Sequence, residues 1–373
     1  MSLQTELSPI LAGFSLPGEC TGIHEITTGH INRTYRLSFT QADGAKTDYI
    51  LQRISTQAFK HPEQVMENVL LVTEHIRSAL EAHGEDASNR VLRVIPTRDG
   101  SPLFTDAEGG AWRVYNFIQN AHSVDVVESS EQFRAVGRAF GDFQNMLSDF
   151  PIERLHDTIP DFHNTVRRIA NFEASVAAAS PERREAAAEE IAFALARKGA
   201  MGRIVAMIDA GVIPLRVTHN DTKCNNVMVD DATGEPLCVV DLDTVMAGSS
   251  LYDFGDAIRF GASTAVEDEP DLDKVHLDME LFSAFAEGFI SRTARGLTLA
   301  ELENLPLGAL VICYEIGLRF LTDYLDGDIY FRIEYPEHNL VRARCQFKLL
   351  TSMEAHQRDM EATVQRLIAK YKG

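Results

Sequence analysis

The most constraining feature of this 373-residue chain is the segment 217–243, where acidic and amide side chains are spaced around a short hairpin pattern. Asp221 stands in a His-x-Asp sequence, Asn226 follows five residues later, and Asp241 lies near the end of the segment. Between Asn226 and Asp241, two apolar runs flank an Asp-Ala-Thr-Gly turn, which is the pattern of a β-hairpin. Such a hairpin brings the start of its first strand close to the end of its second. The pattern therefore predicts that Asn226 and Asp241 face one site.

This order of side chains is similar to that of kinase catalytic loops, where a base Asp precedes two magnesium ligands. A hydroxyl that attacks a phosphate needs an acceptor for its proton, and magnesium prefers hard oxygen ligands. We therefore predict that Asp221 is the catalytic base and that Asn226 and Asp241 hold the metal, with Asp243 as an additional candidate ligand. Any one of these residues alone would be interpreted as a solvated turn residue. Their order between two apolar strands favours the catalytic interpretation.

A second motif, Asp-Phe-Gly at 253–255, matches the metal-binding sequence of protein kinases but comes too late in the chain. It follows a Gly-Ser-Ser loop and lies in the expected helix 252–260. We therefore expect Asp253 to accept hydrogen bonds from the backbone of the catalytic loop, and we assign His219 a structural role as well. The alternative for Asp253 is a helix N-cap.

The composition narrows the range of partners and compartments. A net charge of −20 and a pI near 5.0 argue against nucleic acid and anionic membranes as partners. We find no apolar run that reaches the length of a membrane span, and no basic-then-apolar signal pattern at the N-terminus. The five cysteines are odd in number and scattered, which indicates reduced thiols in a cytoplasmic protein.

Strand signals dominate the first third of the chain, and helix signals dominate the rest. This change predicts an α+β, bilobal architecture with a small antiparallel β-sheet lobe that carries one helix and a larger, mainly helical lobe. We place the nucleotide-binding lobe at residues 1–118, the catalytic and substrate-binding lobe at residues 119–373, and a hinge near 115–120. The expected strands are 23–27, 34–39, 49–53, 91–95, 103–104 and 112–118. The expected helices are 62–80, 131–147, 181–210, 281–325 and 339–370.

At His219, Asp221, Asn226 and the segment 240–243, the chain resembles the aminoglycoside/choline phosphotransferase family. These are small-molecule kinases with a protein-kinase-like fold, and the order of the expected elements extends the resemblance over nearly the full length. The resemblance implies that ATP with Mg²⁺ is bound and that a small molecule with a hydroxyl group is the second substrate.

A narrower resemblance connects the chain to the N-acetylhexosamine 1-kinases of that family, which phosphorylate the anomeric hydroxyl of N-acetylglucosamine or N-acetylgalactosamine. Two alternatives stay open. One is the same fold acting on an amino alcohol, methylthioribose or an aminoglycoside, and the other is a non-catalytic, kinase-like nucleotide-binding protein. The segments that carry the resemblance are 29–35, 51–54, 112–118 and 318–330. The residues that it implies for sugar binding are Asp221, Arg319, Asp323, Tyr324 and Tyr330.

The loop 28–33 lies where a kinase places its phosphate-covering hairpin, although it has a single glycine and would by itself be a generic turn. Arg53 stands where protein kinases carry a lysine on the third strand, so we expect it to pair with a phosphate or with Glu67. Lys46 and Lys60 are alternatives. We expect the strand 112–118 at the edge of the sheet, where backbone groups would bind adenine. The predicted nucleotide contacts are Gly29, Asn32, Thr34, Arg53, Glu67, Tyr115 and Phe117.

Overall fold

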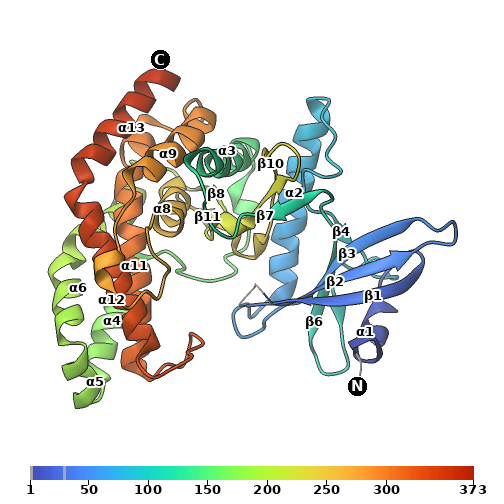
Figure 1. Ribbon diagram of the computed structural model, residues 1–373, viewed down its shortest axis with the longest axis horizontal. Coiled ribbons are helices and arrows are strands. Elements are labelled where there is room, and N and C mark those ends of the chain that lie inside the picture. The colour runs from blue at the N-terminus through green and yellow to red at the C-terminus, as the bar shows by residue number, and fades with distance from the viewer. Residues whose placement is uncertain (1–2, 28–30) are drawn as a thin grey trace.

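The computed structural model describes residues 3–27 and 31–373, and these residues form two lobes that lie side by side (Figure 1). The predicted nucleotide contact Gly29 lies outside the described residues. The N-terminal lobe contains a twisted sheet with one long helix, and the C-terminal lobe is mainly helical. This is the α+β, bilobal architecture that the sequence predicts.

A six-stranded antiparallel sheet forms the N-terminal lobe, in the order β1-β2-β3-β6-β4, with β5 also paired to β6. The strands are β1 (Glu19–Ile26), β2 (Arg33–Thr40), β3 (Lys46–Arg53), β4 (Val94–Ile95), β5 (Phe104–Thr105) and β6 (Ala111–Asn116). The helices are α1 (Leu3–Leu11) and α2 (Pro62–Ala82), which cover opposite faces of the sheet.

The expectation that the last strand of this lobe lies at the sheet edge is wrong. β6 pairs with β3 on one side and with β4 and β5 on the other. Its first five residues are all buried, as is typical of a central strand covered on both faces. The short strands β4 and β5 were too brief to show their pairing in the sequence pattern.

The chain leaves this lobe after β6 and enters the next within a few residues. Asn89 fixes this crossing, because its side chain accepts a hydrogen bond from the Gln119 amide at 2.8 Å and donates one to the Gln119 carbonyl at 2.9 Å. The following strand, β7 (Ala121–Ser123), already pairs with β9 of the C-terminal lobe. We therefore propose residue 118 as the boundary between the lobes.

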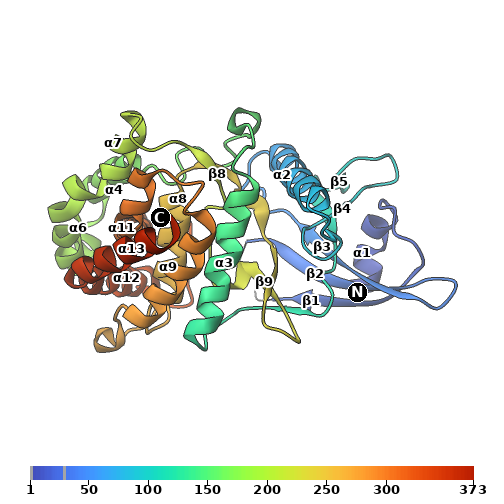
Figure 2. The ribbon, with the colours of Figure 1, turned by 90° about the horizontal axis from the view of Figure 1, so that it is seen from above.

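The C-terminal lobe places its small β elements beside the N-terminal lobe and its helices behind them (Figures 1 and 2). α3 packs against α9 on one side and β10 on the other. The strands are β8 (Arg216–Thr218), β9 (Val227–Asp230), β10 (Pro236–Val239) and β11 (Met246–Gly248), and the 3₁₀ turns are η1 (Ile152–Arg154), η2 (Cys224–Asn226), η3 (Leu242–Thr244) and η4 (Leu272–Lys274). The helices are α3 (Ser130–Met146), α4 (Thr165–Ala178), α5 (Pro181–Ala186), α6 (Ala188–Met201), α7 (Arg203–Asp209), α8 (Ser250–Gly261), α9 (Met279–Thr293), α10 (Leu299–Glu303), α11 (Leu305–Asp326), α12 (His338–Ala355) and α13 (Gln357–Tyr371).

Three helices that the sequence predicts as continuous are divided in the structure. The stretch 181–210 forms three helices, with a break at Gly202. The stretch 281–325 also forms three, because a capping box at Thr298 begins α10 and Pro306 stands in the first turn of α11. The tail turns at His356, between α12 and α13. The sequence analysis did not anticipate α4.

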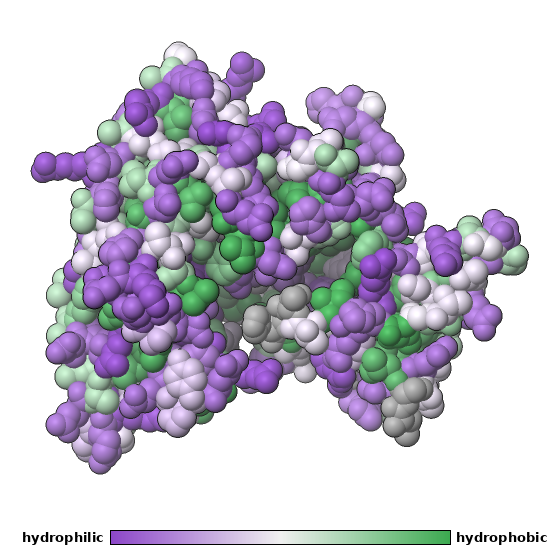
Figure 3. All heavy atoms as spheres, viewed as in Figure 1, coloured by the Kyte–Doolittle hydropathy of each residue, from purple (hydrophilic) through white to green (hydrophobic). Residues whose placement is uncertain are grey.

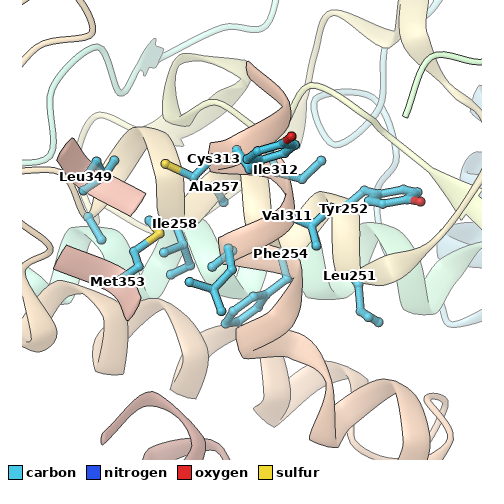
Figure 4. Packing of buried hydrophobic residues seen from close by; sticks show 14 of the residues in the cluster. Leu251, Tyr252, Phe254, Ala257, Ile258, Val311, Ile312, Cys313, Leu349 and Met353 are labelled. Carbon is cyan, nitrogen blue, oxygen red and sulfur yellow. The ribbon is translucent and has the colours of Figure 1, made fainter. Parts of the chain in front are cut away.

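The centre of the C-terminal lobe is α11, which packs against α8 and α12 (Figure 4). Phe254 and Ile258 of α8 meet Val311 and Ile312 of α11 in this core. By length and composition, α11 could cross a membrane, although the sequence analysis found no apolar run of that length. In the structure, 83% of its most apolar window is buried inside the protein. A helix that is apolar on all sides is typical of the centre of a large lobe as well as of a membrane span.

The crossing of α8 and α11 depends on two glycines that allow close backbone approach. A Cβ atom on Gly308 would lie 2.2 Å from the Leu251 carbonyl oxygen, and one on Gly255 would lie 2.3 Å from the Gly308 carbonyl oxygen. No rotamer change relieves a contact with backbone. The two helices can therefore pack at this distance only with glycine at both positions.

We predict that Gly308→Ala lowers the free energy of unfolding by about 2–3 kcal/mol, as overpacking of a tight core does. Denaturant-induced unfolding followed by circular dichroism measures this change. Gly199→Ala is the matched control, because Gly199 lies in α6 with nothing within 4 Å of its added methyl group, and there the better helix propensity should stabilise the protein by up to about 1 kcal/mol. Equal effects of the two substitutions would contradict the close crossing.

Candidate active site

The predicted catalytic loop connects β8 to β9 and faces the hollow between the two lobes, which Figure 3 shows in the centre of the molecule. Asn220 within the loop has a left-handed backbone with φ of 63°. Asp253 holds this conformation, because its carboxylate accepts hydrogen bonds from the backbone amides of His219 at 2.9 Å and Asn220 at 2.8 Å. The Gln144 side chain donates a third bond to the same carboxylate. The N-cap of α8 is Ser249, so Asp253 braces the loop and does not cap the helix.

His219 joins the catalytic loop to the end of β10. Its Nε2 lies 2.9 Å from the Val240 carbonyl oxygen, so Nε2 carries the proton. The imidazole ring also packs edge-on against Phe140 and Phe143 of α3, each at 5.7 Å between ring centres. These contacts match the structural role that we expected for His219.

Asp221 lies next to a cation and an amide of its own loop. The Lys223 Nζ is 3.0 Å from Asp221 Oδ1, and the Asn226 Nδ2 donates to the Asp221 carbonyl at 2.8 Å and to Oδ2 at 3.3 Å. Burial disfavours a charged carboxylate, but Lys223 and then His219 outweigh it, so the pKa of Asp221 lies below its ordinary value. Asp221 is therefore ionised at neutral pH and able to accept a hydrogen bond from a hydroxyl.

Asp241 has the opposite electrostatic environment. Burial, then the charges of Asp243 and Asp221, raise its pKa to about 6. The backbone amide of Val240 donates to the carbonyl of Asn226 at 2.9 Å, so the hairpin brings residues 226 and 241 together as the sequence predicts. Carboxylates gathered in this way are unfavourable unless a cation compensates them.

The donor set at this point suits a magnesium ion. Asp241 offers a carboxylate, and the Asn226 side chain turns its amide nitrogen toward Asp221, which leaves its amide oxygen for a cation. Across residues 3–27 and 31–373, no group of three or more His, Cys, Asp or Glu side chains has the spacing of a metal site. Magnesium in kinases needs fewer protein ligands, because phosphate oxygens and water complete its shell.

Asp243 is already bound on both of its carboxylate oxygens. The Arg113 guanidinium forms an ion pair with Oδ1, and the Asn32 Nδ2 donates to Oδ2 at 2.7 Å. Both partners belong to the N-terminal lobe. Both Asp243 oxygens therefore already accept a bond from the N-terminal lobe, and the additional metal role of Asp243 stays a prediction.

Arg53 does not form the pair with Glu67 that the sequence suggested as one of its two roles. The Arg53 guanidinium lies over the Trp112 ring, 5.8 Å from its centre, on the sheet face that packs against α1. Glu67 is bonded to His156 Nε2 instead. Lys46 and Lys60, the alternatives, are both exposed. Because alternate residues of a strand point to opposite faces, the cleft-facing residue of β3 is Gln52.

The other predicted nucleotide contacts lie on the cleft side of the sheet or at the hinge. Thr34 accepts a hydrogen bond from Gln52 Nε2 at 3.1 Å. The buried ring of Tyr115 lies beneath the Arg113 guanidinium at 5.0 Å. Phe117 lies at the hinge.

The predicted sugar residues divide into two groups. Arg319 and Tyr330 lie together, with the guanidinium 6.0 Å from the ring centre. Asp323 is buried, and it accepts hydrogen bonds from the backbone amides of residues 329–331 and from Asn339, so its oxygens are used to hold the loop after α11. The Tyr324 ring is buried under Arg183 of α5. Asp323 and Tyr324 therefore do not face a substrate, because one fixes a loop and the other fills the helical core.

A model of the phosphotransferase enzyme family matches residues 22–285, which include the catalytic loop, the hairpin and the N-terminal sheet. The chain belongs to this family. Its members transfer phosphoryl groups, so the kinase interpretation of the loop agrees with the family.

Solved structures share the fold over nearly the whole chain. A microcompartment-associated aminopropanol kinase is 16% identical with a TM-score of 0.61, covering 96% of this chain and 98% of that one. An amicoumacin kinase in complex with AMP-PNP, Ca²⁺ and Ami is 15% identical with a TM-score of 0.59, covering 93% of each chain. A choline kinase from Cryptosporidium parvum Iowa II is 12% identical with a TM-score of 0.57, covering 99% and 100%. These similarities confirm the protein-kinase-like fold.

Two residues of this family member were missed by the sequence analysis. Lys223 stands two positions after Asp221, and this opposite charge within the loop was a signal that the sequence contained. Arg113 gives no such signal, because it lies in a strand far from the hairpin in sequence. Only the pairing of β3 with β6 shows that it faces the cleft.

The raised pKa of Asp241 gives the predicted metal site a pH dependence. Metal ligands must be deprotonated, so a pKa near 6 means that protons compete with Mg²⁺ as the pH falls through this value. We expect the apparent Mg²⁺ affinity in the presence of a nucleotide to be constant above pH 7 and to fall by about tenfold per pH unit well below 6. Calorimetric titration at several pH values measures it.

The nucleotide itself also titrates near this pH, so the Asp241→Asn variant serves as the control. Its weaker residual metal binding should depend on pH only as much as the nucleotide does. The same pH dependence in wild type and variant would contradict the metal role of Asp241.

Proposed function

We propose that this phosphotransferase uses ATP and Mg²⁺ to phosphorylate the anomeric hydroxyl of an N-acetylhexosamine, N-acetylglucosamine or N-acetylgalactosamine. The phosphoryl-transfer half of the proposal rests on the arrangement of Asp221, Asn226 and Asp241. The sugar half rests on one observation, an arginine in an aromatic cluster beside the catalytic loop. We also propose a cytoplasmic location, in keeping with five free cysteines.

In this mechanism, Asp221 accepts a hydrogen bond from the acceptor hydroxyl, orients it and takes its proton as the new bond forms. The anomeric hydroxyl is the most acidic hydroxyl of a sugar, so a carboxylate is an adequate base. Lys223 keeps Asp221 ionised, and Asn226 and Asp241 would hold the metal. Magnesium, when bound, neutralises the negative charge on the transferred phosphoryl group. Positioning by these side chains provides most of the acceleration.

The arginine of the aromatic cluster is Arg319, on α11. Its guanidinium lies 5.4 Å from the ring centre of Phe162, 5.5 Å from that of Phe331 and 6.0 Å from that of Tyr330. Within the described parts of the chain, it forms no hydrogen bond or ion pair. Five N–H donors therefore stay available between aromatic faces, which is the combination that binds a sugar ring and its acetamide oxygen.

Contacts between α11 and the catalytic loop place this cluster beside Asp221. The rings of Phe162 and His163 are 4.5 Å apart, and His163 Nε2 lies 3.3 Å from the Asn220 carbonyl oxygen. His163 is buried and also bonded to Glu315 on α11, so it links the helix of Arg319 to the loop. We therefore propose that an acceptor bound at Arg319 presents its hydroxyl to Asp221, the residue that follows Asn220.

The charge of the cluster discriminates between the candidate acceptors. Burial, and next the charge of Arg319, lower the pKa of Arg168, while Glu315 and Asp161 act in the opposite direction, so a second guanidinium lies near the first. Amino alcohols and aminoglycosides are cations at neutral pH, and two arginines would repel them. An N-acetylhexosamine is neutral and accepts hydrogen bonds from arginine. This observation favours a neutral sugar over a cationic acceptor.

For the nucleotide, we propose contacts with Thr34 and the hinge residues Tyr115 and Phe117, whereas the Asn32 side chain is bonded to Asp243 and to the Ser55 amide. The Arg36 guanidinium lies 4.4 Å from the centre of the Phe117 ring and pairs with Asp48. The sheet therefore presents a planar cation beside an aromatic ring near the hinge. Such a surface can stack against a flat base. The roles of Gly29, Arg53 and Glu67 are not part of this proposal.

The acceptor assignment is tested by coupled ADP release with a panel of N-acetylhexosamines, amino alcohols, methylthioribose and aminoglycosides. We predict turnover on an N-acetylhexosamine, with at least about a hundredfold loss in Asp221→Asn because a positioned base is worth that much. The variant should still bind ATP. Faster turnover on an amino alcohol or aminoglycoside would refute the sugar assignment, and activity above a tenth of wild type in Asp221→Asn would refute the base.

We predict that Arg319→Ala raises the Michaelis constant for the sugar by about tenfold to a hundredfold, which corresponds to the loss of a charged hydrogen-bond donor worth about 1.5–3 kcal/mol. The Michaelis constant for ATP should change little. Arg342→Ala is the matched control, because Arg342 on α12 also lies over an aromatic ring, Phe320 at 5.4 Å. An unchanged sugar constant in a stably folded Arg319→Ala protein would remove Arg319 from the site.

A further inference from the structure

The described part of β3 presents a neutral side chain to the cleft, and the nearest cation comes from the neighbouring strand. Gln52 of β3 stands directly opposite Arg113 of β6 in the antiparallel register. Directly opposed residues share one face of a sheet, and this face packs against α2, where Arg113 also contacts the Met66 sulfur at 3.7 Å. Arg53, one residue further, points to the opposite face.

Arg113 is 1% exposed, and its guanidinium is occupied on both sides. Nε and Nη2 donate to Gln52 Oε1 at 3.0 and 2.8 Å, while Nη1 donates to Asp243 Oδ1. Gln52 in turn donates to Thr34 on β2. One side chain thus connects two strands of the N-terminal sheet to the segment that follows Asp241 in the C-terminal lobe.

The second oxygen of Asp243 extends this network to the phosphate-covering hairpin. Asn32, at the start of β2, donates to Asp243 Oδ2 at 2.7 Å, and its own Oδ1 accepts from the Ser55 amide at 3.0 Å. The α2 side chain of Asn68 donates to the Val245 carbonyl at 3.0 Å. The N-terminal lobe therefore holds residues 243–245 from three directions.

This network costs desolvation energy, so stability alone is a weak reason for it. Burying an ion pair is often no more favourable than burying apolar side chains of the same size. Its geometry offers a different gain, because the Arg113 guanidinium holds Gln52 through two donors and Asp243 through a third, which fixes the carboxylate relative to the sheet. Asp243 is two residues from Asp241, so fixing one fixes the backbone that carries the other.

We propose that Arg113 is a positioning residue for the metal site. By holding Asp243 and Gln52 together, it sets the place of Asp241 relative to the hairpin that covers the phosphates. The proposal rests on the ATP and magnesium half of the proposed function and is independent of the acceptor.

The test is the double variant Arg113→Gln/Asp243→Asn, which removes both charges but keeps groups that can hydrogen-bond. The single variants would leave one buried charge unpaired and unfold the protein. Isothermal calorimetry measures ATP binding as a function of Mg²⁺ concentration. We expect the Mg²⁺ concentration for half-maximal ATP binding to rise by about tenfold or more, as when the supporting residues of a metal site are removed. An unchanged Mg²⁺ requirement in the folded variant would overturn the proposal.

A second variant keeps the proposal testable if the double variant does not fold. Asn32→Ala removes one hydrogen bond to Asp243 from a half-buried position and leaves the Arg113 pair intact. We expect it to raise the Mg²⁺ requirement by about threefold without lowering the melting temperature by more than a few degrees. No change in Asn32→Ala, combined with an unfolded double variant, would assign Arg113 a role in stability alone.

The matched control is Arg197→Gln/Glu354→Gln, which removes a bidentate pair, at 2.8 Å for both contacts, between α6 and α12. It should lower the melting temperature without changing the Mg²⁺ requirement, and an equal Mg²⁺ effect there would overturn the proposal. Failure of the proposed function is a separate outcome. Wild-type protein that binds no ATP with Mg²⁺ refutes both, whereas Mg²⁺-dependent ATP binding without sugar turnover refutes the sugar assignment alone.

Discussion

The structure depends on one electrostatic constraint, the gathering of Asp221, Asp241 and Asp243 around a single buried hairpin. The three carboxylates differ in how their negative charge is compensated. Lys223 compensates Asp221 from within the loop, and Arg113 compensates Asp243 from the other lobe. Asp241 forms no ion pair within the described residues, and burial together with the charges of Asp243 and Asp221 raises its pKa. This arrangement supports the proposal that Asp241 binds a metal ion.

The rest of the fold keeps these charges in place. Asp253 fixes the left-handed turn at Asn220, and α8, which carries Asp253, is locked against α11 by close glycine contacts. The same α11 carries Arg319 at the other side of the catalytic loop. One buried helix pair therefore sets the distance between the base and the proposed acceptor pocket. Rigid helices hold such a constellation better than loops do.

The acceptor side shows how a shared fold can serve different chemistry. Solved structures with a similar fold include an aminopropanol kinase and a choline kinase, and both aminopropanol and choline are cationic molecules. Within the described residues Arg319 forms no ion pair, and Arg168 lies near it, so two guanidinium groups are gathered here by side chains that the backbone fold does not determine. In the proposed function, substrate choice would depend on a few residues of α4, α11 and the loop after α11.

The sequence by itself determined the hairpin between Asn226 and Asp241, the two-lobe architecture and the hydrogen bonds from the loop backbone to Asp253, because each follows from a local pattern of neighbouring residues. The catalytic and metal-binding roles stay predictions. Tertiary structure decided the rest. Arg53 turned out to face away from the cleft because strand register, which a single strand does not reveal, sets its side. Asp323 is of a residue type that binds sugars, but its carboxylate oxygens accept hydrogen bonds from backbone amides of the loop after α11. Arg113 and Asp243 are separated by 130 residues, and only the meeting of the lobes makes them a pair.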